Sequence, residues 1–125
     1  MMRRPTRGVR TRAQAIGDEA ESAATRLLER RGLAIVARNY RTRFGEIDLI
    51  ARDGATLVFV EVRYRRSSRA WGGAADSVDH RKRQRLAAAA RQYLARLPRE
   101  PACRFDLVAM QGEDCTWVRG AFEIA

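Results

Sequence analysis

The chain has 125 residues, 46% of them hydrophobic, a length that fits one domain and argues against two. Its charge is the unusual quantity: 25 basic and 15 acidic side chains give a net charge of +10, and every basic residue except Lys82 is arginine. Such an excess predicts a polyanionic partner, in the first place a nucleic acid, because clustered cations bind phosphates. A membrane surface or an acidic protein could use the same charge, so charge alone fixes no function.

Other features of the composition exclude several classes of protein. Cys103 and Cys115 have no neighbouring histidine, and two cysteines are too few for a zinc site or a disulfide framework. The basic N-terminus is followed by no apolar signal-peptide core, and no stretch approaches 18 apolar residues. The sequence also lacks a P-loop and a dinucleotide-binding fingerprint. We therefore expect a soluble, cytoplasmic protein that binds no membrane and no small-molecule cofactor.

The first half of the chain predicts a basic arm, a helix and three strands. The arm, residues 1 to 11, carries arginines without periodicity. From residue 11 to 31, apolar residues recur at helical spacing, and Gly32 follows as a C-cap. The three strands are expected at residues 33 to 40, 46 to 52 and 56 to 64, the last two joined by the hairpin signal Asp53-Gly54.

The second half predicts a long loop, a helix and further strands. Residues 65 to 77 are polar and glycine-containing, as in many binding loops. A helix is expected over residues 79 to 97, then a strand over 103 to 110 and one or two edge strands over 116 to 124. Because strands such as Leu57-Val58-Phe59-Val60 are apolar on both faces, helices should cover both faces of the sheet. Residues 12 to 125 are thus expected to form a single domain of the α/β class, a three-layer α/β/α sandwich with a mixed central sheet.

Two acidic residues, Asp48 and Glu61, interrupt the apolar strands of the central hairpin. A buried carboxylate costs several kcal/mol unless it is paired or binds a cation. A two-residue loop at Asp53-Gly54 would place Asp48 opposite Phe59 and diagonal to Glu61 on one face, about 7–8 Å apart at Cα, whereas a three-residue loop would separate them. Alternation adds Arg63 to the face of Glu61.

This arrangement predicts chemistry on phosphodiesters. Asp48 and Glu61 could hold Mg²⁺ or Mn²⁺, which activates a bound water and neutralises charge on the phosphorus, while Arg63 holds the scissile phosphate. The alternative is an ion network within the sheet. Glu46 and Asp106 stay outside the predicted site, because pairing with Arg43 or Arg104 explains them equally well.

Three segments carry a resemblance to a known family: Gly45-Glu46-Ile47-Asp48-Leu49-Ile50, Phe59-Val60-Glu61-Val62-Arg63 and Arg104-Phe105-Asp106-Leu107-Val108. They resemble the YraN family of small bacterial proteins, which is grouped with the restriction-endonuclease-like PD-(D/E)xK nucleases and Holliday-junction resolvases. The resemblance implies that fold and assigns metal binding to Asp48 and Glu61. It also implies that Arg63 stands where the family has lysine, that Glu21 is a helix acid of the site, and that Lys82 matches a family lysine.

A basic surface is expected beside these residues. The side chains predicted to bind nucleic acid come from the 65–77 loop and the start of the second helix: Arg65, Arg66, Arg69, Arg81, Lys82 and Arg85. Trp71 could stack on an unpaired base or lie over the core.

The sequence therefore predicts a Mg²⁺- or Mn²⁺-dependent DNA endonuclease with Asp48, Glu61 and Arg63 as catalytic residues, to which the resemblance adds Glu21. Branched or structured DNA as the substrate follows from the resemblance alone, and a symmetric junction would favour a two-fold homodimer. One alternative is a non-catalytic nucleic-acid-binding protein that retains the nuclease fold, with Arg63 marking a lost activity. Another is an adaptor for an acidic protein.

Overall fold

A computed structural model of the chain describes residues 11–65, 79–112 and 114–123. The predicted basic arm lies outside the described residues, apart from residue 11, and so does the 65–77 loop beyond its first residue. In chain order the elements are α1 (Arg12–Arg30), β1 (Ala34–Arg41), β2 (Glu46–Asp53), β3 (Thr56–Arg65), α2 (His80–Leu94), β4 (Cys103–Gln111) and β5 (Asp114–Phe122).

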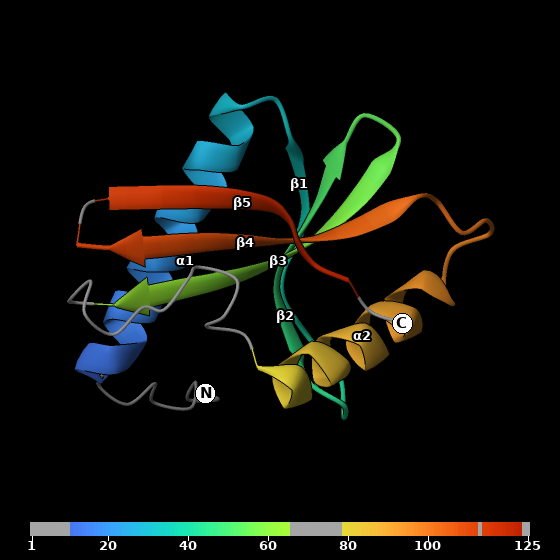
Figure 1. The fold of residues 1–125 in the computed structure, drawn as a ribbon, viewed down its shortest axis with the longest axis horizontal. Helices are drawn as coiled ribbons and strands as arrows, with labels where there is room; N and C mark the ends of the chain where they lie inside the picture. The colour runs from blue at the N-terminus through green and yellow to red at the C-terminus, as the bar shows by residue number, and fades with distance from the viewer. Residues whose placement is uncertain (1–10, 66–78, 113, 124–125) are drawn as a thin grey trace, which may run out of the picture.

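The strands form one five-stranded sheet in the order β1-β2-β3-β4-β5 (Figure 1). Neighbouring strands are antiparallel except β3 and β4, which are parallel. A parallel pair requires the chain to cross one face of the sheet between its strands, and α2 lies in that connection. The sheet is therefore mixed, as predicted.

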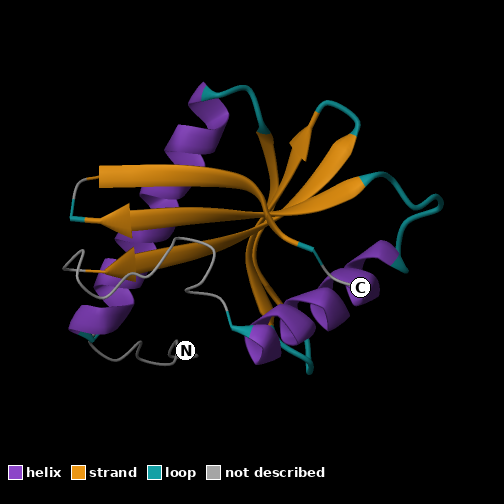
Figure 2. Ribbon diagram, in the orientation of Figure 1, coloured by secondary structure: helices purple, strands orange, loops and turns teal. Residues whose placement is uncertain are grey.

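Each face of the sheet is covered by one helix (Figure 2). Leu28 of α1 packs in a buried cluster that includes Val60, whereas Leu86 of α2 packs in a second cluster that includes Phe59. Alternate residues of β3 thus supply both clusters, because successive side chains of a strand point to opposite faces. The three-layer α/β/α arrangement predicted from the doubly apolar strands is confirmed. Among the described residues, no helix combines the length and the apolarity needed to cross a lipid bilayer.

The helix ends follow local signals. Thr11 caps α1 through a reciprocal pair of hydrogen bonds with Gln14 (3.1 and 2.9 Å), and Gly32 follows its last turn with a φ of 92°. The second helix is shorter than predicted, because it ends at Leu94. The main-chain N–H groups of Arg96 and Leu97 donate to carbonyls three residues earlier, so tight turns replace the last helical turn.

The turn between β2 and β3 differs from the predicted one. Asp53 pairs with Thr56, so the two-residue loop is Gly54-Ala55, and Gly54 has the positive φ (60°). The register is consequently shifted by two residues from the prediction. Because the shift is an even number of residues, Asp48 and Glu61 would lie opposite each other instead of diagonally if the ladder continued past Leu49 and Val60, its last pair.

Candidate metal centre

Asp48 lies in a fork of the sheet. Strands β2 and β3 pair from the turn as far as Leu49 and Val60, and beyond this pair they diverge (Figure 1). The main-chain N–H of Val62, beyond the end of the ladder, donates to Oδ2 of Asp48 over 2.8 Å. The Asp48 carboxylate therefore takes the place that a main-chain carbonyl would have in a continuing ladder, and it is held between the two strands.

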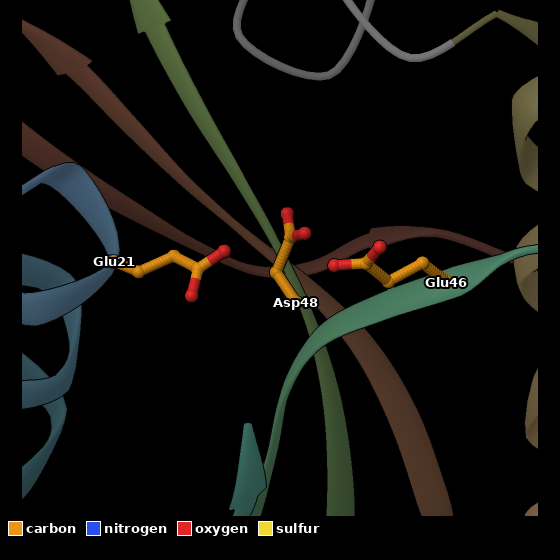
Figure 3. A group of neighbouring side chains, drawn as sticks. All are labelled: Glu21, Glu46 and Asp48. Atoms are coloured by element: carbon orange, nitrogen blue, oxygen red, sulfur yellow. The ribbon is translucent and has the colours of Figure 1, made fainter. Parts of the chain in front are cut away.

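Two further carboxylates meet Asp48 in this fork. Glu21 comes from α1 and Glu46 from the first residue of β2, and one oxygen of each acid lies within 4.8 Å of one oxygen of each of the others. Figure 3 shows Asp48 between the other two side chains. All three residues are half-buried, so bulk water does not fully screen the repulsion between their charges.

Glu21 is enclosed by polar neighbours of β1. Its Oε1 lies 3.9 Å from Nη2 of Arg38, and its side chain is hydrogen-bonded to Asn39, which has a φ of 51°. Burial, and next the negative charge of Asp48, raise the pKa of Glu21 above its ordinary value, although the neighbours in β1 oppose the shift. The contacts with Arg38 and Asn39 therefore do not offset the free-energy cost of keeping this carboxylate charged.

Glu61, on β3, is almost fully buried, with 3% of its surface exposed. Its Oε2 contacts two cations, Nε of Arg63 at 3.3 Å and Nζ of Lys82 at 3.4 Å. Burial and the adjacent Asp48 carboxylate nevertheless raise the pKa of Glu61 to about 8, against the opposing charges of Lys82 and Arg63. Asp48 and Glu61 therefore interact across the fork, as the two-residue loop predicts.

A comparison with Asp106 shows how unusual this environment is. Among the described residues, Asp106 and Glu61 are the two buried charged or polar side chains. Asp106 accepts hydrogen bonds from Nε of Arg104 on both oxygens (3.0 and 3.2 Å), from Nε1 of Trp117 (3.0 Å) and from the N–H of Gly120 (2.9 Å). It is a satisfied structural acid, in agreement with its omission from the predicted site.

By contrast, buried carboxylate oxygens around the fork have no hydrogen-bond partner in the structure. They are Oε1 of Glu21 and Oε1 of Glu61. A buried polar atom without a partner is costly, and hard divalent cations such as Mg²⁺ and Mn²⁺ prefer carboxylate oxygens. Because every candidate ligand here is a carboxylate, the residues fit such a cation.

The predicted site residues are distributed unevenly. Asp48, Glu61, Arg63 and Glu21 all lie at the fork, whereas Arg66 and Arg69 lie outside the described residues. Arg65 ends β3, and Arg81 and Arg85 are exposed on α2. Lys82, predicted to bind nucleic acid, is partly exposed, and its ammonium group also contacts the buried Glu61.

Glu46 is the member of the acid cluster that sequence reasoning missed. Glu46 is ion-paired, as the alternative to a site role predicts, but its partner is Arg41, whose Nε contacts Oε2 at 3.3 Å, and not the predicted Arg43. Strand alternation could have found it, since Glu46 lies two residues before Asp48 and thus on the same side of β2.

Known proteins match this chain over most of its length. The model of the uncharacterised protein family UPF0102 matches residues 20–110. A UPF0102 protein of Halorhodospira halophila is 58% identical over 106 residues, which cover 85% of each chain. UPF0102 protein RSc3265 of Ralstonia nicotianae is 54% identical over 116 residues, 90% of this chain and 89% of that protein. UPF0102 protein YraN of Salmonella agona is 54% identical over 115 residues, 90% of this chain and 86% of that protein.

Proposed function

The chain belongs to the uncharacterised protein family UPF0102, and from this premise we propose that it is a divalent-metal-dependent nuclease that hydrolyses phosphodiester bonds of DNA. Membership agrees with the resemblance to YraN, since YraN of Salmonella agona is named as a UPF0102 protein. Family membership by itself assigns no reaction, so the proposal rests on the chemistry of this chain's residues.

The observation that carries the proposal is the crowding of four carboxylates in the fork, two of which have a buried oxygen without a hydrogen-bond partner. Glu21, Glu46 and Asp48 approach within 4.8 Å, and Glu61 adjoins Asp48 while one of its oxygens has no hydrogen-bond partner. A purely structural acid would resemble Asp106, with every oxygen satisfied. A protein retains such repulsion most readily where a cation or a reaction requires it.

In this proposal, Glu21, Glu46 and Asp48 hold Mg²⁺ or Mn²⁺, and the unpartnered Oε1 of Glu61 completes the set of carboxylate oxygens available around the fork. A bound cation of this kind supplies a more acidic water molecule and neutralises charge on the phosphate. The Val62 N–H fixes Asp48, so the chain holds this carboxylate in place before any substrate arrives.

The two cations beside Glu61 have a separate role. Arg63 and Lys82 converge on the same oxygen from β3 and α2, and both are partly exposed (29% and 38%). We assign them to the scissile phosphate, whose negative charge grows during hydrolysis. Lys82 supplies an ammonium group beside Glu61, the acid of the segment Glu61-Val62-Arg63. The replacement of the motif lysine by Arg63 therefore does not remove lysine from the site.

Cleavage assays test the proposal directly. Labelled four-way junction, flap, single-stranded and duplex DNA would be incubated with the protein in Mg²⁺, Mn²⁺ or EDTA. We expect metal-dependent cleavage by the wild type, loss of cleavage in Asp48→Asn and Glu61→Gln, and full activity in Glu29→Gln, an exposed acid at the end of α1. The order of rates on the four substrates tests the preference for branched DNA, and sedimentation with a junction tests the homodimer.

Two results of the cleavage assays would rule out the proposed nuclease activity. If the wild type cuts no substrate, or if Asp48→Asn cuts as fast as the wild type, the chain is not a metal-dependent nuclease. Salt-sensitive binding to DNA with no heat of Mn²⁺ binding would then identify a non-catalytic nucleic-acid-binding protein. Binding to an acidic protein, but to no nucleic acid, would identify the adaptor.

A further inference from the structure

The loop between β1 and β2, residues 42–45, presents an exposed aromatic side chain next to the candidate metal centre. Phe44 is 44% exposed, and Val36 (42%) is the other exposed large hydrophobic residue among those described. Glu46 of the acid cluster lies two residues after Phe44. The ring belongs to neither buried cluster of the core, so a face of it is available to a binding partner.

The loop holds its shape through hydrogen bonds centred on Thr42. Its Oγ1 accepts from the N–H groups of Phe44 (3.0 Å) and Gly45 (3.1 Å) and lies 3.0 Å from the Gly45 carbonyl oxygen. The main chains of Thr42 and Gly45 are also hydrogen-bonded to each other in both directions, at 2.8 and 3.3 Å. The ring of Phe44 is therefore carried by a rigid turn, and little conformational entropy is lost when a partner packs against it.

The turn is also docked on α2. A Cβ atom on Gly45 would lie 3.1 Å from Cβ of Arg85, a tighter contact than most Cβ atoms make, so the backbone of the loop lies close against the helix. Arg81 is one helical turn before Arg85 and exposed on the same side of α2. This contact brings the basic flank of α2 beside the loop.

The surroundings of the ring are cationic. The guanidinium carbon of Arg43 lies 5.0 Å from the centroid of the Phe44 ring, and Arg41 contacts Glu46 at 3.3 Å. A single aromatic ring among arginines is too small for a stable protein interface, which typically buries about 800 Å² on each partner. The same combination suits a nucleotide, because arginines bind its phosphate and the ring stacks on its base.

We infer that Phe44 stacks on an unpaired base of the strand that enters the metal centre and thereby directs cleavage to nucleotides outside a regular duplex. This inference rests on the proposed function, whose substrate class it narrows. A base inside a duplex has both faces covered by its neighbours, whereas an unpaired base offers a face to the ring. Arg43 and the exposed arginines of α2 neutralise the phosphates on either side.

Binding measurements without hydrolysis test this inference. The full-length protein would be titrated in EDTA into fluorescein-labelled single-stranded DNA and into a blunt duplex of the same length. Phe44→Ala should lower the single-strand affinity about fivefold or more, the usual effect of one lost stacking contact. We expect it to change the duplex affinity less than about twofold, Phe44→Trp to restore single-strand binding, and the matched control Val36→Ala to bind like the wild type. Thermal melting of each variant checks its fold.

The outcomes separate this inference from the proposed function. Equal loss on both DNAs, no loss, or no DNA binding by the wild type overturns the role of Phe44. Cleavage that depends on Asp48 but not on Phe44 overturns the inference alone. Stacking that depends on Phe44 in a protein that cuts nothing overturns the nuclease and the directing of cleavage, and it leaves only the role of Phe44 in binding unpaired bases.

Discussion

The ammonium group of Lys82 lies 3.4 Å from the carboxylate of Glu61, although one belongs to the first turn of α2 and the other to the middle of β3. Asp79 caps that turn by accepting the N–H of Lys82 over 2.8 Å, which fixes the backbone of the lysine. The contact joins a helix to the fork of the sheet. It therefore gives the site a second cation, beside Arg63 of β3.

Loss of this cation should slow cleavage. Lys82→Ala is expected to lower the cleavage rate about 100-fold, since a preorganised positive charge near the phosphate is removed. Lys82→Arg keeps the charge and should recover part of the rate. Arg91→Ala, an exposed site on the same helix, serves as the control for a general effect of charge. Equal rates for the Lys82 and Arg91 alanine variants would contradict the assigned role.

Relief of the crowded carboxylates should stabilise the metal-free protein. Glu21→Gln removes one negative charge from the cluster while it retains the shape of the side chain, and we expect it to raise the free energy of unfolding by about 0.5–2 kcal/mol. Added Mn²⁺ should raise the melting temperature of the wild type and raise that of Glu21→Gln less. Thermal melts with and without MnCl₂ measure both effects. If Glu21→Gln were less stable than the wild type in EDTA, repulsion between the clustered carboxylates would not be lowering the free energy of unfolding.

Stability of the metal-free protein should depend on pH through Glu61. Burial and the Asp48 charge raise the pKa of Glu61 from an ordinary 4.5 to about 8, so between these values the folded protein keeps a proton that the unfolded chain has lost. The stabilisation from this proton is complete below about pH 4.5 and disappears as the pH rises through 8. Urea unfolding at pH 5, 6.5 and 8 should show a decline in the wild type that is smaller in Glu61→Gln. Parallel declines in the two proteins would contradict the assignment.

Removal of Asp106 should affect stability and leave the metal site alone. Asp106→Ala leaves the part-buried donors Nε of Arg104 and Nε1 of Trp117 without this acceptor, although Arg104 keeps its bond to Asp53, and we expect a loss of about 1–3 kcal/mol in the free energy of unfolding. Asp106→Asn should lose less, because it retains an acceptor. Isothermal titration of the folded Asp106→Asn protein with Mn²⁺ should give the affinity of the wild type. A weakened affinity would place Asp106 in the functional site.

The elements of the fold could be predicted because their signals are local. Three of these signals are patterns within a few residues: the apolar residues at helical spacing in α1, the apolar residues on both faces of β3, and the glycines that end α1 and form the β2–β3 turn. The turn between β2 and β3 could not be placed correctly from Asp53-Gly54, because both Asp53-Gly54 and Gly54-Ala55 satisfy the preference for glycine. The pairing of Asp53 with Thr56 decides between them.

The site could be predicted only in part, because its members come from four elements. Asp48 and Glu61 stand out as charges within apolar strands, and one hairpin relates them. No local pattern predicts that Glu46 meets Glu21 of α1, or that Lys82 of α2 reaches Glu61, since those contacts depend on how each helix docks on the sheet. Glu21 was expected at the site only because of the resemblance to a family, since nothing in its neighbouring sequence indicates such a role.

The fork between β2 and β3 also ties this chemistry to the completion of folding. Glu21 enters it from the helix on one face, and Lys82 approaches Glu61 from the helix on the other. A nascent or partly unfolded chain that lacks either layer has an incomplete centre, so in the proposed nuclease cleavage of DNA would begin only after both helices have docked on the sheet. Assembly of the fork from both layers would then act as a safeguard, because only the folded molecule has all of the proposed catalytic groups in one place.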